Sequence, residues 1–142
     1  MNNILEDYKK NGFVKIENVF DKSFISNIIG ELESLTDVDT YKDSNGKPRR
    51  IERVYDKGEY LKKLSLVVKQ KLKDIFGYNL NIFKDKYNFK PPGGEGFFCH
   101  YDGVFYFYDS KNEKKRGWYE YADYFVNVAI PMDPCSEKNA TL

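Results

Sequence analysis

The chain has 142 residues, the length of one ordinary domain, and 41% of them are hydrophobic, which is enough to form a core. Its 23 lysine and arginine residues balance 22 aspartate and glutamate residues, so the overall charge favours neither a nucleic-acid partner nor a membrane. The polar N-terminus lacks the apolar run of a secretory signal, and no stretch reaches the roughly 18 apolar residues that span a bilayer. The two cysteines form no Cys-x-x-Cys motif. We therefore expect a cytoplasmic protein with reduced thiols.

The chain begins with patterns of helix and strand. After a first helical turn that breaks at Asn11-Gly12, the segment GFVKIENVF predicts a short strand. Residues 21–35 place apolar side chains at the spacing of one helix face, with Asp21 as the expected N-cap. This segment is the first predicted amphipathic helix.

A polar, turn-rich segment separates this helix from the next one. Residues 36–54 predict a long loop because they are rich in charged and turn-forming side chains. Residues 60–77 then predict a second amphipathic helix, with lysines on its solvated face and Gly77 as its C-terminal cap. We therefore expect a helical part over residues 1–77.

Residues 78–142 have a different texture, rich in tyrosine and phenylalanine. Aromatic and β-branched residues predict strands over residues 78–90, 96–108 and 124–130. The charged residues 109–123 are too numerous for a tight hairpin and predict an exposed loop. The second part is therefore expected to be a β-rich structure.

The only histidine of the chain stands two residues before an aspartate, in the sequence His100-Tyr101-Asp102. On a strand, residues i and i+2 share a face, so the imidazole and the carboxylate would meet at one point. Ferrous iron is commonly bound by two histidines and one carboxylate, of which this motif supplies two. Taken alone, the tripeptide favours the simpler alternative, a surface histidine paired with an acid.

The surrounding sequence resembles the phytanoyl-CoA dioxygenase family. The resemblance rests on an ordered set of residues that precede and include the histidine: Lys86, Asn88, Lys90, Pro91-Pro92-Gly93, Phe97, His100 and Asp102. The downstream sequence GWYEYADYFVNVAIPMDPCSEKNATL resembles the family's tryptophan loop, next strand and Asn-Gly-type turn. The upstream sequence GFVKIENVFDKSFISNIIGELESL resembles its opening strand and helix, so the match runs from about Gly12 to Leu142.

The resemblance implies an α+β fold, in which N-terminal helices precede a double-stranded β-helix (a cupin-like jelly-roll). It implies a 2-oxoglutarate-dependent dioxygenase that hydroxylates a small organic molecule with O2, using Fe(II) and 2-oxoglutarate. His100 and Asp102 would bind the iron, Asn88 and Phe97 would lie beside 2-oxoglutarate, and Trp118 would close the pocket. Each of these last three residues has an alternative structural role of equal weight. Asn88 would form a strand-end turn, Phe97 would be a core aromatic and Trp118 would anchor a loop.

The chain also departs from the family pattern. The family's third iron ligand is a second histidine, followed by an arginine that pairs with 2-oxoglutarate, and the single histidine of this sequence cannot complete that set. We therefore expect residues 1–142 to be one partial domain, an N-terminal portion that lacks the second half of the jelly-roll and is inactive alone. The alternatives are an inactive jelly-roll pseudoenzyme, and a module that binds a sugar, another small anion or single-stranded nucleic acid.

The substrate itself cannot be identified from these patterns, but basic residues suggest its charge. Arg53 lies in the loop before the second helix, and Lys86 lies beside Asn88 on a predicted strand. Such cations favour an anionic substrate group such as a carboxylate or phosphonate. Arg49 and Arg50 adjoin a predicted turn and are expected to be a solvated basic loop.

Overall fold

The computed structural model describes residues 4–93 and 98–138 and divides the chain into two compact units, Met1–Gly94 and Glu95–Leu142. The first unit contains three α-helices and a three-stranded antiparallel sheet, and the second contains a two-stranded antiparallel sheet and a short 3₁₀ helix. The described chain is therefore an α+β structure. None of its helices combines the length and the apolarity needed to cross a membrane.

The predicted helices are confirmed. A short helix α1 (Ile4–Asn11) is followed by Gly12, whose φ of +78° suits glycine. Helix α2 (Lys22–Ser34) begins at Asp21, whose side chain accepts a hydrogen bond of 2.8 Å from the backbone N–H of Phe24. Residues 13–17, by contrast, form no strand, so the strand predicted after Gly12 is wrong.

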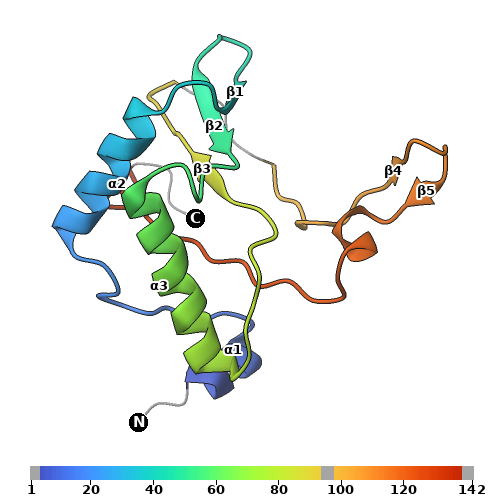
Figure 1. Cartoon of the computed structure of the whole chain (residues 1–142), viewed down its shortest axis with the longest axis horizontal. Helices are drawn as coiled ribbons and strands as arrows, with labels where there is room; N and C mark the ends of the chain where they lie inside the picture. The colour runs from blue at the N-terminus through green and yellow to red at the C-terminus, as the bar shows by residue number, and fades with distance from the viewer. Residues whose placement is uncertain (1–3, 94–97, 139–142) are drawn as a thin grey trace. The chain divides into compact units, whose positions relative to one another are not determined.

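Helix α3 (Glu59–Phe76) lies beside α2 (Figure 1). Its first turn is held by a side chain from α2. Its N-cap residue, Gly58, has no side chain to offer. Instead, the two carboxylate oxygens of Glu31 accept hydrogen bonds of 3.0 Å from the backbone N–H groups of Tyr60 and Leu61. A Cβ at Gly58 would collide with the Glu31 carboxylate, so a larger residue there would displace this side chain from the interhelical cap.

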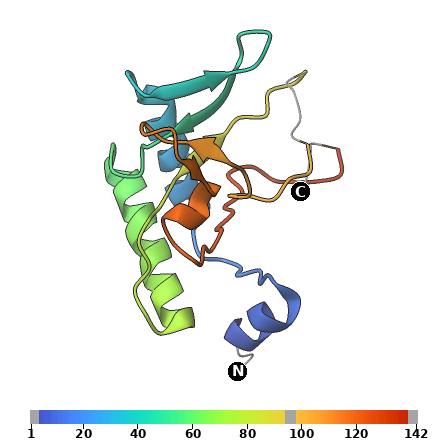
Figure 2. The same cartoon turned by 90° about the vertical axis from the view of Figure 1, so that its right-hand side faces the viewer.

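A β-hairpin replaces the long loop predicted over residues 36–54. Strands β1 (Asp39–Lys42) and β2 (Pro48–Glu52) pair antiparallel, and β3 (Lys86–Asn88) adds to the other edge of β2; Figure 2 shows this hairpin at the top. The Asp43 side chain closes the turn, because its Oδ1 atom accepts hydrogen bonds from the backbone N–H groups of Asn45 and Lys47. The segment is therefore polar because it forms a hairpin with one face exposed to solvent, not because it is a long loop.

The core of the first unit lies where β2 meets the two longer helices. Its buried apolar residues come from α2, β2 and the turn after it, and α3: Ile28, Leu32, Ile51, Val54, Leu61 and Leu64. Tyr87 pairs with Ile51 across the β2–β3 ladder and lies on the same face of the sheet. Burial raises the pKa of the Tyr87 hydroxyl to about 12. That face of the sheet is therefore the core face, and the other carries polar residues.

The second unit contains less regular structure than the sequence predicts. Strand β4 (Phe107–Tyr108) forms only the last two residues of the strand predicted over residues 96–108. It pairs with β5 (Lys114–Lys115), which lies in the segment predicted as an exposed loop, and the 3₁₀ helix η1 (Gly117–Glu120) follows. The turn is held by Asp109, whose Oδ1 atom accepts two backbone hydrogen bonds of 2.9 Å. Residues 124–130 form no strand, so that prediction is wrong. Neither sheet of the described residues closes into a double-stranded β-helix, and the jelly-roll stays a prediction.

Candidate metal centre

His100 has its imidazole ring oriented by the backbone just before it. Its Nδ1 atom lies 2.6 Å from the carbonyl oxygen of Phe98, and a carbonyl can only accept. Nδ1 therefore carries the proton in the neutral ring, which leaves the lone pair on Nε2. The side chain is 59% exposed, so Nε2 is accessible to an ion from solvent.

Asp102 places one carboxylate oxygen near that lone pair. Its Oδ1 atom lies 3.5 Å from His100 Nε2, which is longer than an ordinary hydrogen bond of about 2.7–3.2 Å. Two ligand atoms on adjacent octahedral positions, each about 2.1 Å from a metal, lie about 3.0 Å apart. The spacing of Nε2 and Oδ1 is thus close to that of a ligand pair, and the donor set suits ferrous iron.

The two side chains meet without the strand that the sequence predicts. Residues 98–101 are irregular, and a turn at Asp102 and Gly103, where φ is +80°, follows them. The pair is brought together by this turn and by the Phe98 carbonyl rather than by strand alternation. Strand geometry was therefore the wrong reason for expecting their proximity.

The turn is packed against the tryptophan that the sequence analysis singled out. The backbone N–H of Trp118 donates a 3.3 Å hydrogen bond to the Gly103 carbonyl, and a Cβ at Gly103 would lie 3.0 Å from the indole ring. Gly117 has a φ of +55°, and a Cβ there would collide with the Gly103 carbonyl oxygen. Two glycines thus allow the η1 backbone and the indole to press directly onto the turn that carries Asp102.

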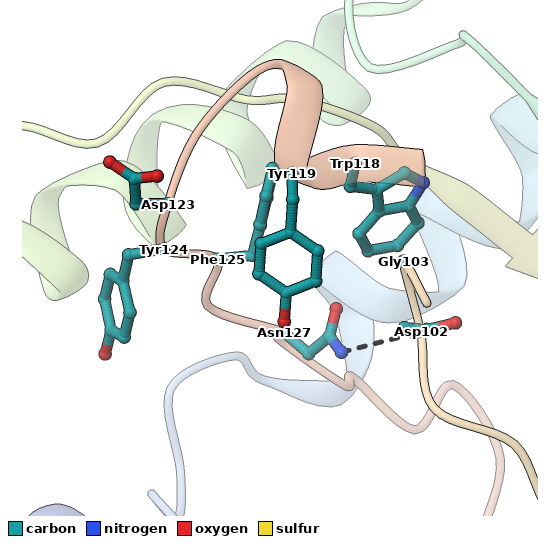
Figure 3. Close-up of a pocket in the computed structure, with 8 residues that line it drawn as sticks. All are labelled: Asp102, Gly103, Trp118, Tyr119, Asp123, Tyr124, Phe125 and Asn127. Atoms are coloured by element: carbon teal, nitrogen blue, oxygen red, sulfur yellow. Dashed lines mark hydrogen bonds between the residues drawn. The ribbon is translucent and has the colours of Figure 1, made fainter. Parts of the chain in front are cut away.

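A small open pocket adjoins Asp102 (Figure 3). Its volume is about 180 Å³, below the roughly 300–1,000 Å³ of typical ligand sites, so it suits only a small molecule. Phe125 braces one wall, with its ring centroid 5.5 Å from that of Trp118 and 6.4 Å from that of Tyr119. The lining residues are Asp102, Gly103, Trp118, Tyr119, Asp123, Tyr124, Phe125 and Asn127.

Within residues 4–93 and 98–138, no group of three or more His, Cys, Asp or Glu side chains is arranged to hold a metal ion. The candidate centre described here is therefore a pair of ligands. Both cysteines are free and exposed, and Cys135 donates through Sγ to the Asp133 carbonyl at 3.5 Å.

The predicted 2-oxoglutarate and substrate residues of β3 belong to the first unit, on the polar face of its sheet. In the ladder Asn88 lies opposite Arg50, and Lys86 lies opposite Glu52. Glu52 is buried, and it binds Arg50 Nε at 2.8 Å and Lys84 Nζ at 3.0 Å. This face therefore groups one buried carboxylate with several cations.

Arg50 and Arg53 have different environments from those expected. Arg50 lies over the Tyr41 ring, 4.7 Å from its centroid, and its side chain is only 24% exposed, so the solvated loop predicted for it is wrong. Arg53 is exposed and pairs with Asp39 at 2.5 Å, and this hydrogen bond raises the pKa of its guanidinium. The Asp85 carboxylate accepts from the backbone N–H groups of Arg53 and Val54, which holds this turn in place.

Phe97, the predicted wall beside 2-oxoglutarate, lies outside the described residues. Sequence reasoning missed three contributors to the site: Gly103, Gly117 and Asn127. A signal for Asn127 was present, because it is the only polar residue in the apolar run over residues 125–130. The two glycines carried no such signal, because their role depends on contacts between distant segments.

One comparison with known proteins finds a relative. The chain is 27% identical, over 152 residues, to the probable alpha-ketoglutarate-dependent hypophosphite dioxygenase of Stutzerimonas stutzeri. The match covers 96% of this chain and 49% of the relative, so the chain spans about half the length of the curated relative it matches. No family model matches the chain, and no solved structure does. The similarity supports the superfamily of 2-oxoglutarate-dependent oxygenases and a general dioxygenase type, not the phytanoyl-CoA dioxygenase family in particular.

Proposed function

We propose that the chain is part of an Fe(II)- and 2-oxoglutarate-dependent dioxygenase that hydroxylates a small molecule. The observation that supports this most is the pair of ligand atoms, His100 Nε2 and Asp102 Oδ1, 3.5 Å apart with the imidazole tautomer set for binding. The similarity to an alpha-ketoglutarate-dependent dioxygenase over 96% of the chain supports it independently.

In this proposal each residue has a distinct task. His100 supplies a neutral nitrogen and Asp102 a single carboxylate oxygen to the ion, and the set needs a further ligand that these two residues do not supply. Iron, when bound with 2-oxoglutarate, supplies the activation of dioxygen. Trp118 packs on the Asp102 turn and walls the pocket beside it, while the roles of Asn88 and Phe97 toward 2-oxoglutarate rest on the family resemblance alone. We expect the complete iron site to form within a jelly-roll fold.

Linked binding of metal and co-substrate tests this function. 2-Oxoglutarate should tighten Fe(II) binding to the chain several-fold, because its keto and carboxylate oxygens chelate the same ion. Succinate, which lacks the keto group, is the matched control and should leave the affinity unchanged. Anaerobic equilibrium dialysis measures both, and the isolated 142-residue chain should form no succinate in air because its ligand set is incomplete. Equal affinities with both acids would contradict the proposal, and sugar or anion binding independent of metal would favour the ligand-binding module.

The substrate in this proposal is a small anion. Support comes from the cationic side chains on the polar sheet face and from the relative, whose name specifies hypophosphite, an anion. Lys86→Ala should weaken the binding of hypophosphite by about 10–100-fold, the loss expected for one charge-assisted hydrogen bond. Arg53→Ala should weaken it less, because Asp39 already engages that guanidinium.

Titration followed by NMR measures these affinities. The matched control is Lys71→Ala, which removes an exposed lysine from α3 and should leave the affinity for hypophosphite unchanged. If Lys86→Ala binds hypophosphite as tightly as the unmodified chain, Lys86 is not a substrate residue.

A further inference from the structure

The two oxygens of the Asp102 carboxylate have different surroundings. Oδ1 faces the lone pair of His100, whereas Oδ2 accepts a 3.2 Å hydrogen bond from the side-chain amide of Asn127. Figure 3 shows this bond across one side of the pocket, with the Asn127 side chain reaching Asp102 from the opposite segment. The hydrogen bond therefore distinguishes one oxygen from the other.

That distinction matters for a carboxylate that binds a metal through one oxygen. Rotation about χ2 exchanges the two oxygens, and nothing in the covalent structure favours Oδ1 over Oδ2. A donor fixed on one oxygen opposes this rotation and directs the other oxygen to the ion. His100 has an equivalent partner, because the Phe98 carbonyl fixes Nδ1 and so directs Nε2.

The segment that carries Asn127 is anchored well enough to perform this task. Phe125, two residues before it, packs against the rings of Trp118 and Tyr119. Trp118 in turn contacts Gly103, the residue after Asp102. Asn127 and Asp102 are thus connected through the hydrogen bond and through a short chain of packed side chains, which fixes their separation.

We infer that Asn127 is a positioning residue, which holds Asp102 Oδ2 so that Oδ1 is the atom presented to a divalent metal ion beside His100 Nε2. This inference rests on the proposed function, because it assigns Asn127 a role in the same metal site. It adds a residue that neither the resemblance nor the comparison identifies.

Mn(II) titration of the chain tests the inference without any need for turnover. Because His100 is the only histidine, paramagnetic broadening of its ring signals gives the affinity of this site alone. Asn127→Leu keeps the size of the side chain and removes the amide, and it should weaken Mn(II) binding about 10–100-fold. Asn127→Gln keeps the amide on a longer stem and should restore most of the affinity. The matched control, Asn81→Leu, makes the same chemical change at an exposed position of the first unit and should have no effect.

A second measurement uses the unmodified chain, in case Asn127→Leu fails to fold. During titration with diamagnetic Zn(II), the side-chain amide signal of Asn127 should shift with the same apparent affinity as the His100 ring. An Asn127 amide that does not respond, or Leu and Gln variants that bind Mn(II) equally, would overturn the inference while leaving the proposed function intact. If the unmodified chain binds no metal at His100, the proposed function and the inference both fail.

Discussion

Replacing either His100 or Asp102 with alanine should lower the affinity of the chain for Fe(II) by at least about 100-fold. Each substitution leaves only one protein ligand, and a single imidazole or carboxylate competes poorly with water for a divalent ion. In any longer polypeptide that contains these residues and converts 2-oxoglutarate to succinate, the same substitutions should abolish that conversion. Anaerobic dialysis against Fe(II) and assay of succinate are the two measurements.

The control for this prediction is Asp133→Ala, which removes an exposed carboxylate from the same unit. It should leave both the affinity and the conversion unchanged, so that a general loss of negative charge is excluded as the cause. Asp102→Asn refines the comparison, because it keeps the shape and an acceptor oxygen while removing the charge. If both alanine variants bind Fe(II) as tightly as the unmodified chain, iron binds elsewhere.

Gly117→Ala should destabilise the second unit by about 2–4 kcal/mol. Part of this is the roughly 1–2 kcal/mol that alanine loses at positive φ, and part is the contact between the new Cβ and the backbone oxygens of Gly103 and Phe105. Those oxygens belong to the segment after Asp102, so the same substitution should also weaken metal binding at His100. Urea titration followed by NMR measures the free energy of unfolding of each unit separately.

Gly46→Ala separates the two causes. Gly46 also has a positive φ, of +77°, but no atom lies within 4 Å of its added Cβ. It should therefore cost the first unit only about 1–2 kcal/mol. An equal loss at both glycines would show that the close approach of η1 to the turn contributes nothing.

Helices were the most predictable part of this fold. The periodic apolar residues of α2 and α3, the Asp21 N-cap and the Gly77 C-cap are local signals, and the structure confirms each of them. The β-hairpin at residues 39–52 was not predicted, because its turn depends on the Asp43 side chain and its register on pairing with β3, 34 or more residues later in the chain. The strands of the second unit were overpredicted, because aromatic residues there pack as isolated contacts around short elements.

In the candidate site, too, local features could be predicted from the sequence, whereas contacts between distant segments could not. The resemblance of the surrounding sequence, and not the tripeptide alone, pointed to a metal at His100 and Asp102, and the structure brings their side chains to 3.5 Å. Asn127 stands out in the sequence as the one polar residue of an apolar run, but its partner could not be read from the sequence, because the hydrogen bond joins residues 25 positions apart. The Gly117 contact carried no sequence signal, because it depends on two backbones meeting. Arg53 shows the reverse problem, since a substrate role inferred from charge did not anticipate its pairing with Asp39.

Trp118 is the only tryptophan of the chain, and its indole ring rests on the residue that follows Asp102. Nearly all fluorescence excited at the red edge of the protein band therefore comes from a single position, at the wall of the candidate site. The chain carries a built-in optical reporter, whose emission should respond to a quenching ion at His100 and to any loosening of the turn. Ligand screening can use this natural signal without labels.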